Sequence, residues 1–231
     1  MRTIITLDDK KFGGSYYKAA HVEIIDENNI HSAKYVNINQ LLNELTGSKV
    51  EDERFYRIGK MPQNYYDGVI RRGADDQLSG QILITIPKQK TTMQFENTRY
   101  NMCFPALLFS YSITNCKIQQ TQVYALKGNK WNDKSMLYNY PFGNVNTYGH
   151  SVCWGSNTLP AVESLQTLDV VCSLFYSSPC NNDHYNRERS TKWKKNNLRE
   201  ILEKLKQMKE FPDKILVASD RGNIGNLSKF K

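Results

Sequence analysis

Apolar and polar residues alternate with a period of two along the middle of the chain, which is the pattern of β-strands rather than of helices. The runs are rich in Val, Ile, Leu, Phe, Tyr and Thr, and short connections carrying Gly, Asn, Lys or Pro join them. Such connections favour an antiparallel meander. We therefore expect strands at residues 55–58, 81–86, 92–95, 106–111 and 122–126.

A strand and a short helix are expected before this meander. Residues 17–25 have the β-rich, partly alternating composition of a strand, and the turn-forming residues 26–29 follow them. Asn37 is the expected N-cap of a helix that stops at Gly47. One face of that helix carries Ile38, Leu41, Leu42 and Leu45.

Two further helices are expected after the meander. Pro160 opens the first, which runs to about residue 176 with apolar residues at helical spacing. The second covers roughly residues 191–209, with apolar residues on one side and lysines elsewhere, and Pro212 ends it. This order of elements predicts an α+β fold, an antiparallel β-meander flanked by helices. The expected parts are an N-terminal strand-helix extension (1–53), a core (54–186) and a basic C-terminal helix and tail (187–231).

The composition excludes several classes of protein. With 231 residues, 39% of them hydrophobic and 11% aromatic, the chain is long and apolar enough to fold as a globular protein. Its longest apolar stretch, residues 103–109, is far shorter than the roughly 20 residues that cross a bilayer. The first residues lack the apolar region of a secretory signal, so we expect a cytoplasmic location and no membrane association. Five cysteines without a CxxC pair predict reduced thiols.

Positive charge is concentrated near the C-terminus. The net charge is +8, and residues 187–231 hold 13 Lys and Arg against 6 Asp and Glu. A basic segment with Trp193 is compatible with nucleic-acid binding. Lysines spread around an amphipathic helix are, however, typical of a solvated face, and no compact nucleic-acid motif accompanies them. We therefore expect no nucleic-acid partner, and the helix instead suits an acidic face of a protein partner.

A long loop over residues 128–160 contains the candidate chemistry. Regular periodicity disappears there while Gly, Asn, Tyr and Trp accumulate, and long ordered loops are usually functional. Cys153 lies between two glycines of this polar loop, where a thiol can be partly exposed and available as thiolate. By contrast, Cys103 adjoins an apolar strand and Cys172 lies on the apolar side of an expected helix, so both are interpreted as core residues.

This loop resembles the active-site stretch of ubiquitin-conjugating enzymes, in which a His-Pro-Asn tripeptide leads through a Gly to the thioester-forming Cys. The closer resemblance is to the bacterial ubiquitin-conjugating-like family D, which includes protein B of the PRTRC plasmid and mobile-element systems. Phe142-Gly143 stands in place of His-Pro, and the Gly-to-Cys spacing is one residue longer. The resemblance covers roughly residues 80–185 and lies in four blocks: Phe104-Pro105-Ala106-Leu107-Leu108-Phe109, Val123-Tyr124-Ala125-Leu126-Lys127-Gly128, Leu137-Tyr138-x-x-Pro141-Phe142-x-Asn144-Val145 and Gly149-x-x-x-Cys153-x-Gly155.

The resemblance implies a carrier thiol. Cys153 would take the C-terminal carbonyl of a ubiquitin-like protein from an activating enzyme as a thioester, and an amine or other nucleophile on a protein target would receive it. A JAB-type deconjugating protease in the same pathway is also implied, and no cofactor or metal is implied for this chain. Asn144 is the candidate donor to the oxyanion, and His184 is the candidate base or amine-positioning group. His150 and Trp154 are interpreted as residues that line and pack the loop.

Other functions fit parts of the sequence less well. A cysteine hydrolase would use Cys153 and His184, but Asp183 is adjacent to His184 in sequence and is badly placed to orient it. A zinc site built from Cys172, Cys180 and His184 lacks a fourth ligand. The main alternative is a catalytically inactive relative that serves as a scaffold, or a nucleic-acid-binding component of a plasmid or mobile-element system.

Overall fold

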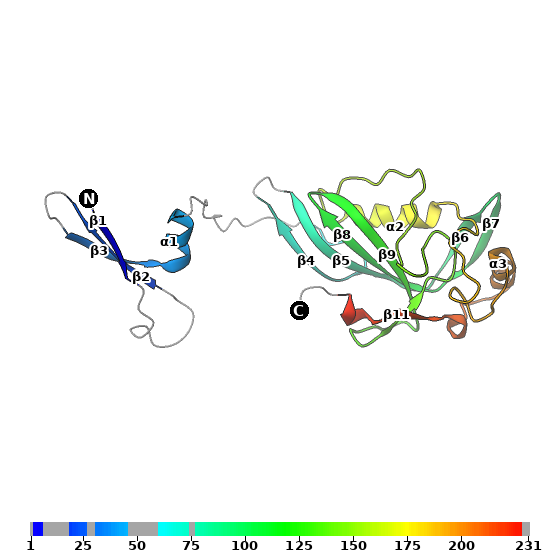
Figure 1. Ribbon diagram of the computed structural model, residues 1–231. Coiled ribbons are helices and arrows are strands. Elements are labelled where there is room, and N and C mark those ends of the chain that lie inside the picture. Colours follow the sequence, from blue (N-terminus) through cyan, green and yellow to red (C-terminus); the bar gives the residue numbers. More distant parts are fainter. Residues whose placement is uncertain (1, 7–18, 27–30, 46–59, 74–76, 228–231) are drawn as a thin grey trace. The chain divides into compact units, whose positions relative to one another are not determined.

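The computed structural model describes residues 2–6, 19–26, 31–45, 60–73 and 77–227. The chain divides between Phe55 and Tyr56 into two compact units, each of which is described by itself (Figure 1). The strand expected at residues 55–58 lies outside the described residues. Among the described residues, no helix is long and apolar enough to span a bilayer.

The N-terminal unit is a three-stranded antiparallel sheet followed by one helix. Its elements are β1 (Arg2–Thr6), β2 (Ala19–Ile25), β3 (His31–Asn37) and α1 (Ile38–Leu45), and β2 is the central strand. The Oδ1 atom of Asn37 accepts a hydrogen bond from the N–H of Gln40 at 3.4 Å, so the expected N-cap is confirmed. The strand expected at residues 17–25 is confirmed over its described part, whereas the helix end expected at Gly47 lies outside the described residues.

The second unit contains a six-stranded antiparallel sheet and a separate two-stranded hairpin. The strands are β4 (Tyr65–Arg72), β5 (Leu78–Ile86), β6 (Gln89–Phe95), β7 (Thr98–Phe104), β8 (Ala106–Thr114), β9 (Lys117–Leu126), β10 (Met136–Asn139) and β11 (Ala218–Asn223). The main sheet has the order β11-β10-β9-β8-β5-β4, and the β6-β7 hairpin interrupts the expected meander between β5 and β8. The expected strands at residues 81–86, 92–95, 106–111 and 122–126 are confirmed.

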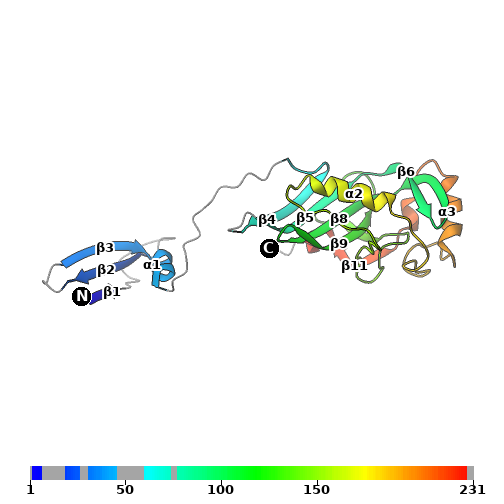
Figure 2. The same ribbon diagram turned by 90° about the horizontal axis from the view of Figure 1, so that it is seen from above.

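Apolar side chains cover both faces of the main sheet. On one face lies α2 (Thr167–Ser177), as Figure 2 shows, and Phe109 of β8 meets Phe175 of α2 with ring centroids 5.2 Å apart. The helix α3 (Leu198–Lys206) contributes buried leucines and an isoleucine to the same core and packs next to β7. On the other face, Leu108 and Tyr124 are buried with Leu137 and Ile224. Burial of apolar surface on both faces stabilises the strands that carry the functional loop.

The helix expected from Pro160 begins seven residues later, at Thr167, so its expected start is wrong. The N–H of Val162 donates to the carbonyl of Cys116 at 2.7 Å, which ties this segment to the turn between β8 and β9. Val162 and Leu165 are both buried, although neither is helical. Their three-residue spacing therefore reflects packing of an irregular segment rather than a helical face.

The last helix is shorter than expected, because α3 covers Leu198–Lys206 and does not begin at residue 191. Thr191 instead forms an antiparallel β-bridge with Leu216. Asn197 then caps the helix, since its Oδ1 atom accepts the N–H of Arg199 at 2.8 Å. This cap fixes the start of α3.

Residues 187–227 do not form a separate tail. In the main sheet β11 pairs with β10, with Asn223 opposite Met136 and Ala218 opposite Tyr138. Ile224, which follows β11, is buried against the sheet. The C-terminal segment therefore belongs to the same compact unit as residues 56–186, and β10 is a strand within the loop that was expected to be irregular.

Candidate active site

Residues 144–153 form a short hairpin, here called the thiol hairpin, that ends at the candidate nucleophile Cys153. The N–H of Cys153 donates to the carbonyl of Asn144 at 2.7 Å. An antiparallel β-bridge joins Val145 to Val152 just inside this bond. The backbone of the thiol-bearing residue is therefore held by strand-like hydrogen bonds within what the sequence presents as an irregular loop.

The thiol hairpin is also bonded to the main sheet. The N–H of Val123 in β9 donates to the carbonyl of His150, and the N–H of Val152 donates to the carbonyl of Thr121, both at 2.9 Å. The pairing of β10 with β9 begins at the next residue of β9, Tyr124. Residues 150–152 of the hairpin thus pair with β9 directly beyond the residues of β9 that pair with β10. This pairing attaches the hairpin to the main sheet.

Cys153 is the exposed cysteine of the chain. All five cysteines lie among the described residues, where Cys172 and Cys180 are buried and Cys103 and Cys116 are half-buried. Burial raises the pKa of the Cys172 and Cys180 thiols to about 12, so both stay protonated at neutral pH. The core interpretation of Cys172 is confirmed, whereas Cys103 is buried only in part. Cys153 is the thiol most accessible to a macromolecular partner.

Asn144 connects the thiol hairpin to the segment that follows α2. Its backbone has a positive φ of 67°, a conformation that Asn tolerates better than most residues. Its side-chain Nδ2 donates to the carbonyl of Pro179 at 2.8 Å. An amide nitrogen carries two hydrogens, so one donor remains for a second acceptor. The backbone of Asn144, the candidate oxyanion donor, is thus hydrogen-bonded directly to the backbone of Cys153.

His184 lies on the same segment after α2, but it is not bonded to the thiol. A Cβ atom on Gly143 would lie 2.5 Å from the carbonyl oxygen of Asn181, so the base of the hairpin packs directly on this segment. His184 itself is half-buried, and no hydrogen bond in the described part of the chain joins it to Cys153 or Asn144. Its catalytic role stays a prediction.

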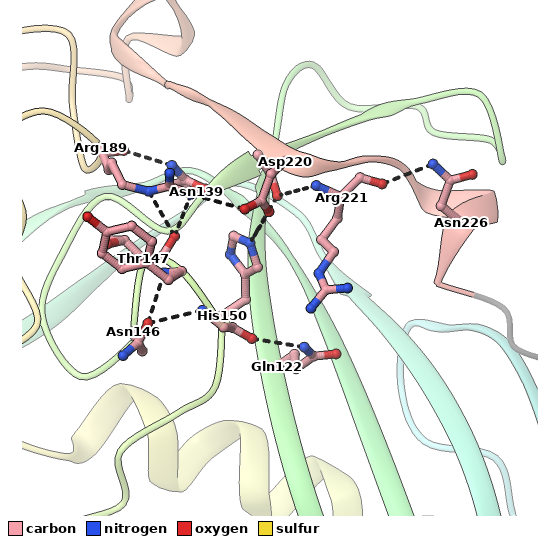
Figure 3. A network of polar contacts seen from close by, with 12 residues as sticks. Gln122, Asn139, Asn146, Thr147, His150, Arg189, Asp220, Arg221 and Asn226 are labelled. Carbon is pink, nitrogen blue, oxygen red and sulfur yellow. Dashed lines mark hydrogen bonds and ion pairs between the residues drawn. The ribbon is translucent and has the colours of Figure 1, made fainter.

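A buried histidine of the thiol hairpin, His150, is hydrogen-bonded to β11, as Figure 3 shows. The side chain of His150 has no solvent exposure, and its Nε2 lies 3.0 Å from Oδ1 of Asp220 and 3.1 Å from Oγ of Ser219. Its ring packs on Tyr124 with centroids 4.6 Å apart. Burial lowers the pKa of His150 despite the opposing effect of Asp220, and the hydrogen bond with His150 lowers the pKa of Asp220. At neutral pH a neutral imidazole therefore faces a carboxylate.

Arg189 completes this network. Its Nε and Nη2 atoms donate to the carbonyl of Thr147 at 3.2 and 3.0 Å, and Nη2 lies 3.3 Å from Oδ2 of Asp220. The guanidinium group also lies over the exposed ring of Tyr148, 4.4 Å from its centroid. Asp220 and Arg189 were not predicted from the sequence, because they are 70 and 39 residues from His150 and belong to no motif.

Comparison with protein-family models identifies the family of the chain. The profile described as prokaryotic E2 family D, where E2 denotes a ubiquitin-conjugating enzyme, matches residues 62–219, more than half of the chain. The chain belongs to this family. No curated protein and no solved structure gave a significant match.

Membership of family D has consequences for the fold and the partners. The α+β architecture is compatible with an E2-like domain. The match extends from just before β4 to the second residue of β11, so it covers residues 187–219 of the C-terminal segment. E2-like proteins in general interact with a ubiquitin-like modifier and an activating enzyme. In the described part of the chain, no three side chains of His, Cys, Asp or Glu are grouped as a metal site would need.

In this family D protein, aromatic residues that flank the thiol hairpin in the sequence pack against the core. Trp154 packs edge to face on Phe175 of α2, with ring centroids 6.3 Å apart, so its interpretation as a packing residue is confirmed. On the other side of the hairpin, Phe142 has no exposure and lies among aromatic rings. The buried ring of Phe142 before the hairpin and the half-buried ring of Trp154 after it hold the hairpin ends, while Cys153 itself stays exposed.

Alkylation of the folded protein should therefore be selective. We expect iodoacetamide at pH 7.5 to modify Cys153 at least about tenfold faster than Cys172 or Cys180, because only an accessible thiolate reacts. Tandem mass spectrometry after a time course of quenched reactions measures the rates, and unfolding in urea should remove the difference. Equal rates in the folded protein would contradict the exposures described above.

Proposed function

We propose that the chain is a carrier that accepts a bacterial ubiquitin-like protein as a thioester on Cys153 and transfers it to an amine or other nucleophile on a target. The observation that carries this proposal is the exposure of Cys153 at the end of a hairpin bonded to the main sheet. A catalytically inactive scaffold would not require an exposed thiol on a fixed backbone. Membership of family D supports the same conclusion.

The loading step requires little catalytic machinery. The Cys153 thiolate attacks the carbonyl carbon of the modifier's C-terminal residue, which arrives as a thioester on the activating enzyme. The bond from that carbon to the activating enzyme's sulfur breaks, and the released thiolate takes up a proton. One thioester replaces another, so the exchange is nearly balanced in free energy. An accessible thiol on a fixed backbone is what the protein must supply, and the thiol hairpin supplies both.

Transfer to an amine is the more demanding step, because an oxyanion develops on the carbonyl and the amine must lose a proton. Asn144 has one side-chain N–H that is not used by Pro179 and is the proposed oxyanion donor. His184 is the proposed base or amine-positioning group, since its segment packs on the base of the thiol hairpin.

Reconstitution tests the proposal. The purified chain is mixed with ATP, a bacterial activating enzyme and the ubiquitin-like protein that this enzyme activates. We expect an adduct of the summed mass that forms only with ATP and is cleaved by dithiothreitol on a gel run without reductant. Omission of ATP or of the activating enzyme serves as the control. Failure of an active pair of partners to give any thiol-sensitive adduct would overturn the proposal.

A further inference from the structure

The backbone at His150 needs an explanation. His150 has a positive φ of 59°, a left-handed conformation that is uncommon for residues other than glycine, although Asn, Asp and His adopt it more often than most. Non-glycine residues persist in this conformation only where the surrounding structure holds them, and such positions cluster at functional sites. The strain lies three residues before Cys153, on the arm of the thiol hairpin that pairs with β9.

The packing and hydrogen bonds of the His150 side chain stabilise this backbone conformation. The side chain is completely buried, packs on Tyr124 and meets Asp220 and Ser219 of β11 through Nε2. A neutral ring with its proton on Nε2 donates to the Asp220 carboxylate, a charge-assisted hydrogen bond of the stronger kind. The return arm of the hairpin is thereby tied to a strand that lies 70 residues further along the chain.

The same carboxylate also holds the turn of the hairpin. Oδ1 of Asp220 faces His150, while Oδ2 faces Arg189, whose guanidinium group binds the carbonyl of Thr147 twice. Thr147 is at the turn and His150 is on the return arm. Asp220 thus fixes two successive parts of the thiol hairpin, although its own side chain is 54% exposed and contributes little to the apolar core.

We propose that Asp220, acting through His150 and Arg189, is a positioning residue that sets the thiol hairpin so that the Cys153 sulfur meets the incoming thioester in the reactive geometry. This inference rests on the proposed carrier function and extends it to β11. Attack within a complex of two folded proteins requires the sulfur at a defined place, and small misplacements cost much of the rate. Alkylation by a small reagent requires only that the sulfur is exposed. The loading rate therefore reports the position of the Cys153 sulfur, whereas the alkylation rate reports its exposure.

Asp220→Ala tests this inference, with Asp220→Asn as the conservative variant, because its side-chain oxygen can still accept from His150. We expect Asp220→Ala to lower the single-turnover rate of loading by about tenfold or more. Asp220→Asn should restore part of that rate, because the amide nitrogen that replaces Oδ2 cannot accept from Arg189. The alkylation rate of Cys153 should stay within about twofold of the unsubstituted protein, since exposure does not change. Glu188→Ala is the matched control. The Glu188 side chain is 59% exposed, close to the 54% of Asp220, and this variant should load normally.

Hydrogen exchange separates failure of this inference from failure of the carrier function. The amide protons of Val152 and Cys153 are bonded within the sheet and the hairpin, so they should exchange about tenfold faster in Asp220→Ala than in the unsubstituted protein. If the unsubstituted protein never loads, the carrier function fails and exchange still tests the anchor. Unchanged exchange, unchanged loading, an equal fall in alkylation, or no rescue by Asp220→Asn would each overturn the positioning role.

Discussion

Replacing Cys153 with alanine is expected to abolish the thiol-sensitive adduct, and replacing it with serine is expected to lower the loading rate by at least about 100-fold. A serine hydroxyl is not ionised at neutral pH, whereas a thiol is partly ionised and is the stronger nucleophile. Any adduct that Cys153→Ser forms is an oxygen ester, which resists dithiothreitol and is cleaved by alkali. Gel analysis with and without reductant distinguishes the two linkages.

The chain offers a matched control for this substitution. Cys103 is half-buried, and its sulfur lies 3.0 Å from the carbonyl of Lys209, where a serine hydroxyl can make the same hydrogen bond. Cys103→Ser should therefore load at the unsubstituted rate. Loading by Cys153→Ala at the unsubstituted rate would show that another residue carries the modifier.

Replacing Phe142 with alanine is expected to lower the free energy of unfolding by about 3 to 5 kcal/mol, because a large buried ring leaves a cavity. Phe142 has no exposure, and its ring lies 5.2 Å from that of Phe104 and 5.3 Å from that of Tyr140. Urea unfolding followed by circular dichroism measures the change. Val170→Ala, at a 60% exposed position of α2, is the control and should change stability by less than about 0.5 kcal/mol. A similar loss from both variants would contradict the described core.

Phe142 also explains the departure from the His-Pro-Asn pattern of ubiquitin-conjugating enzymes. In this chain an aromatic residue fills the core at that point, and Gly143 follows because the backbone of Asn181 leaves no room for a side chain. The bulky ring and the missing side chain together bring Asn144 to the segment after α2. In this arrangement the carbonyl of Asn144 accepts the N–H of Cys153.

Strands of the sheet centre could be predicted from the sequence, but its C-terminal edge could not. In β5, β8 and β9 apolar residues are frequent because both faces of these strands are covered. The residues of β11, Ala218–Asn223, are mostly polar, and their strand conformation depends on pairing with β10. Pairing between segments about 80 residues apart leaves no local pattern, so the C-terminal segment resembled a tail.

The candidate site, like the sheet, could be predicted only in part. Cys153 could be singled out because local composition controls whether a loop thiol is exposed. The anchor of His150 could not, since it depends on Asp220 and Arg189, which only the folded chain brings near it. The sequence alone predicts that His150 lines the loop. Its complete burial and positive φ indicate that His150 also fixes the conformation of that loop.

Mass spectrometry of the ATP-dependent adduct, digested without reductant, tests the central claim most directly. The account predicts that the C-terminal residues of the modifier are found on the peptide that contains Cys153, joined through sulfur and released by dithiothreitol. Attachment to Cys103, Cys116 or a lysine amine, with the Cys153 peptide unmodified, would contradict it.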